Sequence, residues 1–184
     1  MRPPLRPALL LAALSAACAP ERATAPVRAL PSAARAPAPT DACPAACARA
    51  AARARLERAA SGLTYTSESD YPFDFVSAPA TTPRRPPGPL DEPGLRAAFH
   101  IDQNEPVESV SLDEFFARHI ERVDPADRAA RRLVPRYRAL RRTVEAVTGT
   151  TRVYRVGRVQ IRCYLVGTDP WGNVVGLATT AIET

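Results

Sequence analysis

An alternating pattern near the C-terminal end constrains the fold of this chain more than any other feature. Between positions 158 and 165, apolar residues alternate with Arg, Gln and Tyr, as in a strand with one buried face and one wet face. A turn-forming stretch follows at 168–173, and an apolar run from Val174 to Ile182 returns as a partner strand. The first strand is predicted to bury Val159, Ile161, Cys163 and Leu165.

A long amphipathic helix is predicted before this hairpin. Its apolar face recurs at alternating spacings of four and three and comprises Leu133, Tyr137, Leu140, Val144 and Val147. Asp124 followed by Pro125 predicts the N-cap and the first helical position, and Gly149 predicts the end. One helical face packed on an antiparallel sheet predicts an α+β domain.

Shorter signals place the remaining elements. A helix is predicted over 43–60 with Gly62 as its stop signal, followed by a short strand over 63–66. The segment 77–93 contains six prolines and is predicted to be a surface loop, because proline cannot donate to a central strand.

Two strand-like patterns and a capped helix fill the middle of the chain. The strand-like patterns cover 95–102 and 105–110 and are separated by a turn at 103–104. Ser111 and Glu114 form a capping box that predicts a short helix carrying Phe115 and Phe116.

The N-terminal segment resembles an export signal. Two arginines precede an apolar run of about ten residues, which is too short to span a bilayer. Small residues leading into Cys18 favour a lipoprotein signal over 1–18 with lipidation at Cys18; simple cleavage at 17–19 is the alternative. An Ala/Pro-rich tether over 19–45 and a domain over 46–184 would follow. The expected location is the periplasm or the outer membrane, otherwise secretion.

Basic charge is distributed unevenly along the chain. All 25 basic residues are Arg, and the formal net charge is +6. Ten acids stand against three Arg over 61–117, whereas thirteen Arg stand against four acids over 118–162. The Arg-rich helix could bind nucleic acid or another anionic polymer. No aromatic residues are interleaved to stack bases, so a solvated helix face is the favoured interpretation and nucleic acid an unlikely partner.

Catalytic and metal-binding patterns are weak. Cys43 and Cys47 could ligate a metal or form a disulfide, but two ligands do not make a zinc site. His100 and His119 lie in different elements, which favours structural roles, and Cys163 fits a small core residue. No hydrolase or phosphate-loop motif is present, so an enzyme is the weaker class. No cofactor and no metal of its own are expected.

An acidic and aromatic segment, SGLTYTSESDYPFDF at 61–75, stands apart from its Arg-rich surroundings. It could simply cap a turn while Tyr71, Pro72, Phe73 and Phe75 pack beneath. Its Ser-Glu-Ser-Asp-Tyr-Pro-Phe core resembles a motif of the nuclease A inhibitor (NuiA-like) family. The similarity continues at 113–118 and is strongest over 153–184, where Val-Tyr-Arg-x-Gly and the final Glu-Thr both match.

The resemblance implies an α/β/α sandwich related to the PR-1 fold. It also implies a non-enzymatic inhibitor that occupies the nucleic-acid cleft of a sugar-nonspecific ββα-metal nuclease, a metal-dependent DNA/RNA nuclease. By position, the family's contacts with the nuclease become Glu68, Asp124 and Thr184, and Glu68 and Thr184 would reach the partner's metal. A rigid strand would hold the terminal carboxylate. This use requires Thr184 to lie near Glu68.

The chain departs from the family pattern beside Asp124. Pro125 stands where the family has an aromatic residue, and Arg128, Arg131 and Arg132 stand at a helix start that is acidic in the family. A basic helix edge would repel a cationic cleft unless it faces away. The resemblance and the export signal together make an exported nuclease inhibitor the leading hypothesis. The alternative is a PR-1-like envelope domain that binds nucleic acid or another anionic polymer through its Arg-rich helix.

Overall fold

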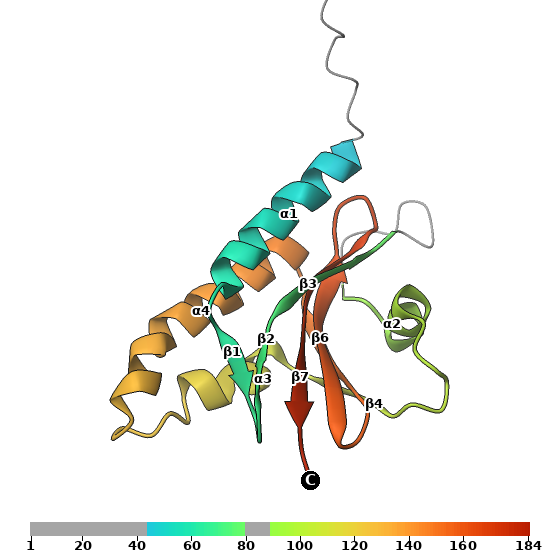
Figure 1. Cartoon of the computed structure of the whole chain (residues 1–184). Helices are drawn as coiled ribbons and strands as arrows, with labels where there is room; N and C mark the ends of the chain where they lie inside the picture. The colour runs from blue at the N-terminus through green and yellow to red at the C-terminus, as the bar shows by residue number, and fades with distance from the viewer. Residues whose placement is uncertain (1–43, 80–88) are drawn as a thin grey trace, which may run out of the picture. The chain divides into compact units, whose positions relative to one another are not determined.

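The computed structural model of this chain describes residues 44–79 and 89–184 (Figure 1). The chain divides into two units, Met1–Thr40 and Asp41–Thr184, and all described residues belong to the second. The predicted signal and lipidation at Cys18, nearly all of the tether, and Cys43 lie outside the described residues. None of the described helices combines the length and the apolar character needed to cross a bilayer.

A five-stranded antiparallel sheet with the order β3-β7-β6-β5-β4 forms the centre of the fold. Its strands are β3 (Asp74–Ala78), β4 (Val107–Val110), β5 (Arg152–Val156), β6 (Gln160–Thr168) and β7 (Val174–Ile182). The hairpin predicted from the alternation is β6 and β7, with Leu165 opposite Leu177. This pairing confirms the antiparallel α+β prediction.

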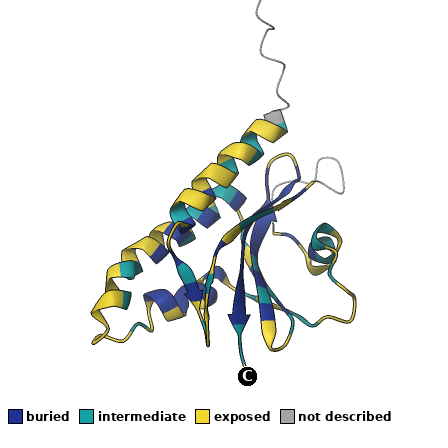
Figure 2. Cartoon of the chain, in the orientation of Figure 1, coloured by how far each residue is buried: buried dark blue, intermediate teal, exposed yellow. Residues whose placement is uncertain are grey.

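Helices cover both faces of this sheet. On one face lie α1 (Pro44–Ala60), α3 (Leu112–Ile120) and α4 (Arg128–Thr148), which share a core with β5, β6 and β7. On the other face, α2 (Glu92–Phe99) packs on a second, smaller core. The arrangement is a helix–sheet–helix sandwich whose interior is buried and whose α1 and α4 surfaces are exposed (Figure 2).

The long helix agrees with its predicted core face but not with its predicted start. Tyr137, Leu140 and Val144 are buried, with Leu133 and Val147 packed beside them, and Gly149 follows the helix at a φ of 67°. The N-cap, however, is Asp127, whose carboxylate accepts from the amides of Ala129 and Ala130 at 3.0 and 2.9 Å. The prediction of Asp124 as the cap was wrong, because a second aspartate, Asp127, caps the helix. The Asp124 carboxylate instead accepts from the Ala126 amide in the turn before the helix.

The predicted strand over 95–102 was also wrong, because residues 95–99 belong to α2 and the rest follows its C-terminal end. Asp91 caps the helix by accepting from the Gly94 amide at 3.0 Å, and Pro93 suits the first turn. His100 ends the helix in the left-handed conformation, at a φ of 53°. The capping geometry overrides the short alternating pattern, which is ambiguous over so few residues.

Two further expectations about the sheet need correction. The second face of β6 is only partly wet: Gln160 is exposed, whereas Arg162 and Tyr164 are half-buried. Tyr164 stacks on Phe99 of α2 with ring centroids 4.7 Å apart. Val159 is 58% exposed, since it lies in the turn before β6 begins. The segment 77–93 is not all loop either: its described ends contribute to β3, which pairs with β7 at a sheet edge, and to α2.

The acidic segment folds into a small hairpin beside the main sheet. It consists of β1 (Thr64–Thr66) and β2 (Asp70–Pro72), paired with Tyr65 opposite Tyr71. Gly62, at a φ of 65°, makes the turn from α1 into β1, as its position in the sequence predicted. The tip of this hairpin points toward the same end of the molecule as the end of β7 (Figure 1).

Candidate functional site

One side-chain and one backbone hydrogen bond join the tip of the β1–β2 hairpin to the end of β7. The Ser67 hydroxyl oxygen accepts from the Ile182 amide at 2.9 Å. The Glu68 amide donates to the Ile182 carbonyl at 3.4 Å. Ser67 also donates from its own amide to the Ser69 carbonyl at 3.0 Å, which closes the tip. The backbone on either side of Glu68 is therefore held by a neighbouring strand rather than left as a free loop.

Glu68 and Thr184 are in direct contact. Oε1 of Glu68 accepts from the Thr184 amide at 3.1 Å and from the Thr184 hydroxyl at 2.9 Å. Both residues are exposed. Within the described ranges, 44–79 and 89–184, Oε2 of Glu68 has no hydrogen-bond partner. The proximity that the resemblance required is present, and it leaves one carboxylate oxygen open to solvent.

The charges next to this contact are already paired. Glu183 binds Arg155 at 2.5 Å, and Arg155 also binds Glu108 at 3.1 Å. The Glu183 amide donates to the Val159 carbonyl at 3.0 Å, which fixes the end of β7 to the β5–β6 turn. Arg155 is therefore shared by two other acids, and the negative charge of Glu68 stays available on the surface.

Aromatic side chains of the acidic segment pack against the domain, as predicted for all but one of the residues expected to do so. Phe73 is buried and lies 6.3 Å from Phe116 between ring centroids. Tyr71 and Phe75 are half-buried, whereas Pro72 is exposed and was wrongly expected to pack. The Tyr71 carbonyl accepts from the Thr179 hydroxyl of β7 at 3.3 Å. The segment thus combines a packed aromatic base with an exposed acidic tip.

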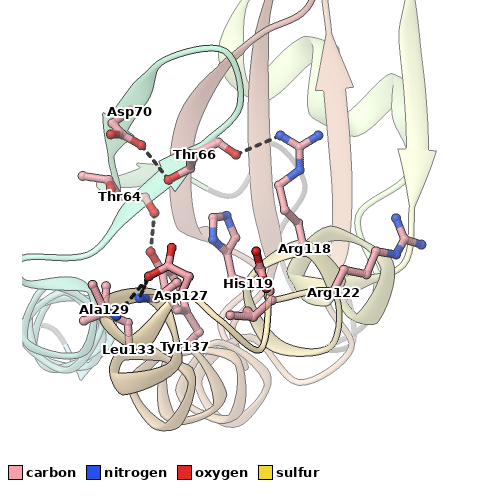
Figure 3. Close-up of a pocket in the computed structure, with 13 residues that line it drawn as sticks. Thr64, Thr66, Asp70, Arg118, His119, Arg122, Asp127, Ala129, Leu133 and Tyr137 are labelled. Carbon is pink, nitrogen blue, oxygen red and sulfur yellow. Dashed lines mark hydrogen bonds between the residues drawn. The ribbon is translucent and has the colours of Figure 1, made fainter.

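Asp124 lies in a separate part of the same surface. Its carboxylate accepts from the Ala126 amide at 2.8 Å in the α3–α4 loop, and it makes no hydrogen bond to Glu68 or Thr184 among the described contacts. It lines a pocket of about 430 Å³ between the hairpin, the end of α3 and the start of α4. Asp70 and Arg118 line the same pocket, and Asp70 accepts from the Thr66 hydroxyl at 2.5 Å (Figure 3).

His119 lies in this pocket and was not expected to belong to a site. Its ring stacks on Tyr137 at 4.5 Å and meets Tyr65 edge-on at 5.2 Å. Its pKa is lowered to about 4, chiefly by burial and also by the charge of Arg118, while the charge of Asp70 opposes the shift. Nε2 has no hydrogen-bond partner among the described residues.

The i,i+4 spacing of Phe115 and His119 places both residues on one face of α3, and this spacing is the sequence signal that could have indicated that His119 is buried. Arg118, next to His119, donates to the Thr66 carbonyl at 3.0 Å and ties α3 to the hairpin. Its partner is a backbone oxygen 52 residues away, which no local pattern predicts.

The arginines at the start of α4 point away from this pocket. Ala129, Ala130 and Leu133 line the pocket, and at 3.6 residues per turn Arg128, Arg131 and Arg132 fall on the other sides of the helix. Arg128, Arg131 and Arg132 line a separate surface hollow instead. The basic edge that would repel a cationic cleft therefore does not share the Asp124 pocket.

The cysteines do not form a functional cluster in the described part of the chain. Cys163 is fully buried on the sheet, and burial raises its pKa to about 11, which keeps the thiol protonated and unreactive. Cys47 is an exposed free cysteine. The described residues contain no group of three or more His, Cys, Asp or Glu side chains that could hold a metal ion.

A comparison with protein families places this chain. No curated protein matches it. The family model described as nuclease A inhibitor-like protein matches residues 50–184, which include the hairpin, the Asp124 pocket and the end of β7. The match covers most of the chain and nearly all of the described domain, so this chain belongs to the nuclease A inhibitor-like family.

Proposed function

We propose that this protein inhibits a metal-dependent, sugar-nonspecific nuclease of the ββα-metal class by filling its nucleic-acid cleft. The observation that carries the proposal is the contact between Glu68 and Thr184 at an exposed end of the fold. Family membership supports an inhibitor, and the geometry supports the part of the surface that would enter the cleft.

The exposed carboxylate suits the site it would occupy. A ββα-metal nuclease presents a divalent cation and cationic side chains to a phosphodiester, and hard divalent cations prefer oxygen ligands. Oε1 of Glu68 accepts from Thr184, so Oε2 and the lone pairs of the Thr184 hydroxyl oxygen remain available on two exposed, adjacent residues. Two oxygens held side by side would imitate the anionic oxygens of the substrate without offering a bond to cleave.

Preorganisation would give this surface its affinity. Binding costs free energy when a mobile loop must be ordered, on the order of 0.5–1.5 kcal/mol for each side chain that is immobilised. The Ser67 and Glu68 contacts with Ile182 already hold the hairpin tip. A nuclease would therefore meet a carboxylate whose backbone is fixed before the encounter.

Asp124 would add a second contact on the α3–α4 loop. Its local hydrogen bond with Ala126 orients the carboxylate in the absence of the aromatic neighbour found in the family. The pocket between Asp124 and Asp70 would then face the rim of the cleft. In this proposal the protein supplies contacts and no chemistry, so it needs no cofactor.

Export with a lipid anchor at Cys18 is part of the same proposal. The described domain begins with α1 at the end of the molecule opposite the hairpin tip (Figure 1). Mass spectrometry of the membrane fraction tests the lipid anchor: a diacylated N-terminal Cys18 is expected, and a soluble chain that begins at position 18 or later without lipid contradicts it.

The inhibitor proposal is tested by titration. Purified chain added to a ββα-metal nuclease should abolish cleavage linearly up to one equivalent, and Glu68→Ala should need far higher concentrations. As a search for the target, the same pair serves as bait in periplasmic and secreted fractions. Recovery of no nuclease, together with salt-sensitive DNA binding that Glu68→Ala leaves unchanged, would favour an anionic-polymer binder instead.

A further inference from the structure

Two adjoining surface hollows beside α4 are lined between them by four arginines. The first is apolar. The hollow has a volume of about 480 Å³; Arg131 and Arg138 line its rim. Its floor is made of aliphatic and proline side chains, namely Ile120, Val123, Pro125, Val134 and Pro135. A second hollow of about 340 Å³, lined by Arg128, Arg131 and Arg132, adjoins it through the shared Arg131. We call these two together the arginine hollow.

The charges of the arginine hollow are not neutralised by the protein. Within the part of the chain that the structure describes, none of its four arginines forms an ion pair. Arg141 on the same helix, by contrast, binds Asp113 at 2.6 Å. The first turn of α4 also lacks an acidic residue. Cationic side chains at this end oppose the helix dipole, so the cluster lowers stability in the free protein.

We propose that the arginine hollow binds the headgroup of an anionic phospholipid at a bilayer surface. Guanidinium groups bind phosphate oxygens in pairs, and the aliphatic floor fits the glycerol and upper acyl carbons beneath that phosphate. Nucleic acid offers the same phosphate, but the described hollow has no aromatic ring on which a base could stack. The combination of unpaired arginines and an aliphatic floor therefore favours a lipid.

The position of the hollow allows contact with a flat surface. The α3–α4 loop and the start of α4 form an outer corner of the domain, away from the central sheet (Figure 1). Arg131 also donates to the Pro125 carbonyl at 3.3 Å, which holds one guanidinium beside the loop. The hollow meets the Asp124 pocket at the α3–α4 loop, because Val123 lines both and Pro125 follows Asp124. Glu68 and Thr184 line neither hollow, so lipid contact here would leave the hairpin tip accessible.

Vesicle binding tests the proposal with the chain from Ala19 onward, which lacks the predicted signal and lipid. The probes are vesicles of phosphatidylglycerol and phosphatidylcholine, pure phosphatidylcholine vesicles, and duplex DNA, each at 0.1 M salt. The unsubstituted chain should bind the anionic vesicles only. The triple variant Arg128→Gln, Arg131→Gln, Arg132→Gln should bind them about a hundredfold more weakly, since each surface arginine contributes about a fivefold factor.

The matched control removes three other exposed arginines, at Arg55, Arg58 and Arg142, and should weaken vesicle binding much less. Val123→Thr, which keeps the shape but adds a hydroxyl to the floor, should weaken it several-fold. Equal losses of vesicle binding in the two triple variants would mean that the general positive charge of the domain causes the binding. Either that result or full binding by Val123→Thr would overturn the proposed lipid site. Failure of the unsubstituted chain to bind anionic vesicles overturns it, as does tighter binding to DNA that the hollow variant abolishes.

Discussion

The hairpin tip and the arginine hollow are both charged surfaces, but they are built in opposite ways. At the tip, one carboxylate is held by hydrogen bonds among Ser67, Glu68, Ile182 and Thr184. In the hollow, long side chains extend from a helix and find no ionic partner among the described residues. The first arrangement suits one geometrically defined target, and the second suits a surface that presents many phosphates.

The strongest test of this contrast removes the charge at the tip. Glu68→Gln keeps the shape and an oxygen for Thr184 but loses the charge that would meet a metal. We expect inhibition of a ββα-metal nuclease to weaken by at least a hundredfold, as for other desolvated charge pairs, with little change in the free energy of unfolding. Glu105→Gln, on an exposed loop, is the control and should inhibit normally. Equal inhibition by both variants would remove Glu68 from the interface.

A second test concerns the pocket between the two regions. The pKa of His119 is lowered from 6.5 to about 4, so the unfolded chain binds this proton more tightly than the folded chain. The contribution of His119 to the free energy of unfolding is therefore fully present above pH 6.5. About 2 to 3 kcal/mol of it is lost as the pH falls toward 4. His119→Phe, which can stack on Tyr137, should remove that part of the loss in urea unfolding between pH 7.5 and 4.5. A pH profile left unchanged by the substitution would mean that the pKa of His119 is not lowered in the fold.

The hydrogen bond beneath Glu68 predicts a smaller effect. Ser67→Ala removes the acceptor for the Ile182 amide and should lower the free energy of unfolding by about 1 kcal/mol. Inhibition should weaken roughly three- to tenfold, because the hairpin tip is less restrained. Ser69→Ala, at the exposed neighbouring serine, should change neither quantity. A loss of stability with full inhibition would show that the restraint does not contribute to binding.

The smallest effect is expected at the hollow, and it has the opposite sign. Arg128→Gln removes a cation from the first turn of α4 and should raise the free energy of unfolding by about 0.3–1 kcal/mol. Thermal unfolding would show a slightly higher Tm, with inhibition unchanged. Arg138→Gln, in the middle of the same helix, is the comparison and should leave the Tm unaltered. Lower stability of the Arg128 variant would mean that this arginine has a stabilising partner.

Local patterns in the sequence predicted the elements whose signals were long. The apolar face of α4 and the β6–β7 hairpin followed from periodicity, because each extends over several turns or residue pairs. The strand-like stretch over 95–102 was too short to settle, and the cap at Asp91 made it a helix. Two aspartates compete to cap α4, and only the folded turn decides that Asp127 does so while Asp124 stays in the loop.

The sequence by itself determined the α+β class and, through a specific motif, the family. It also marked Glu68 and Thr184, because both belong to motifs that short-range comparison can detect. Only the tertiary structure decided that these residues touch across 116 positions, that His119 is buried beside Arg118, and that the arginines at the start of α4 lie outside the Asp124 pocket. The reason is physical: local backbone preferences act over a few residues, whereas a site depends on strand register and helix packing, which join distant parts of the chain.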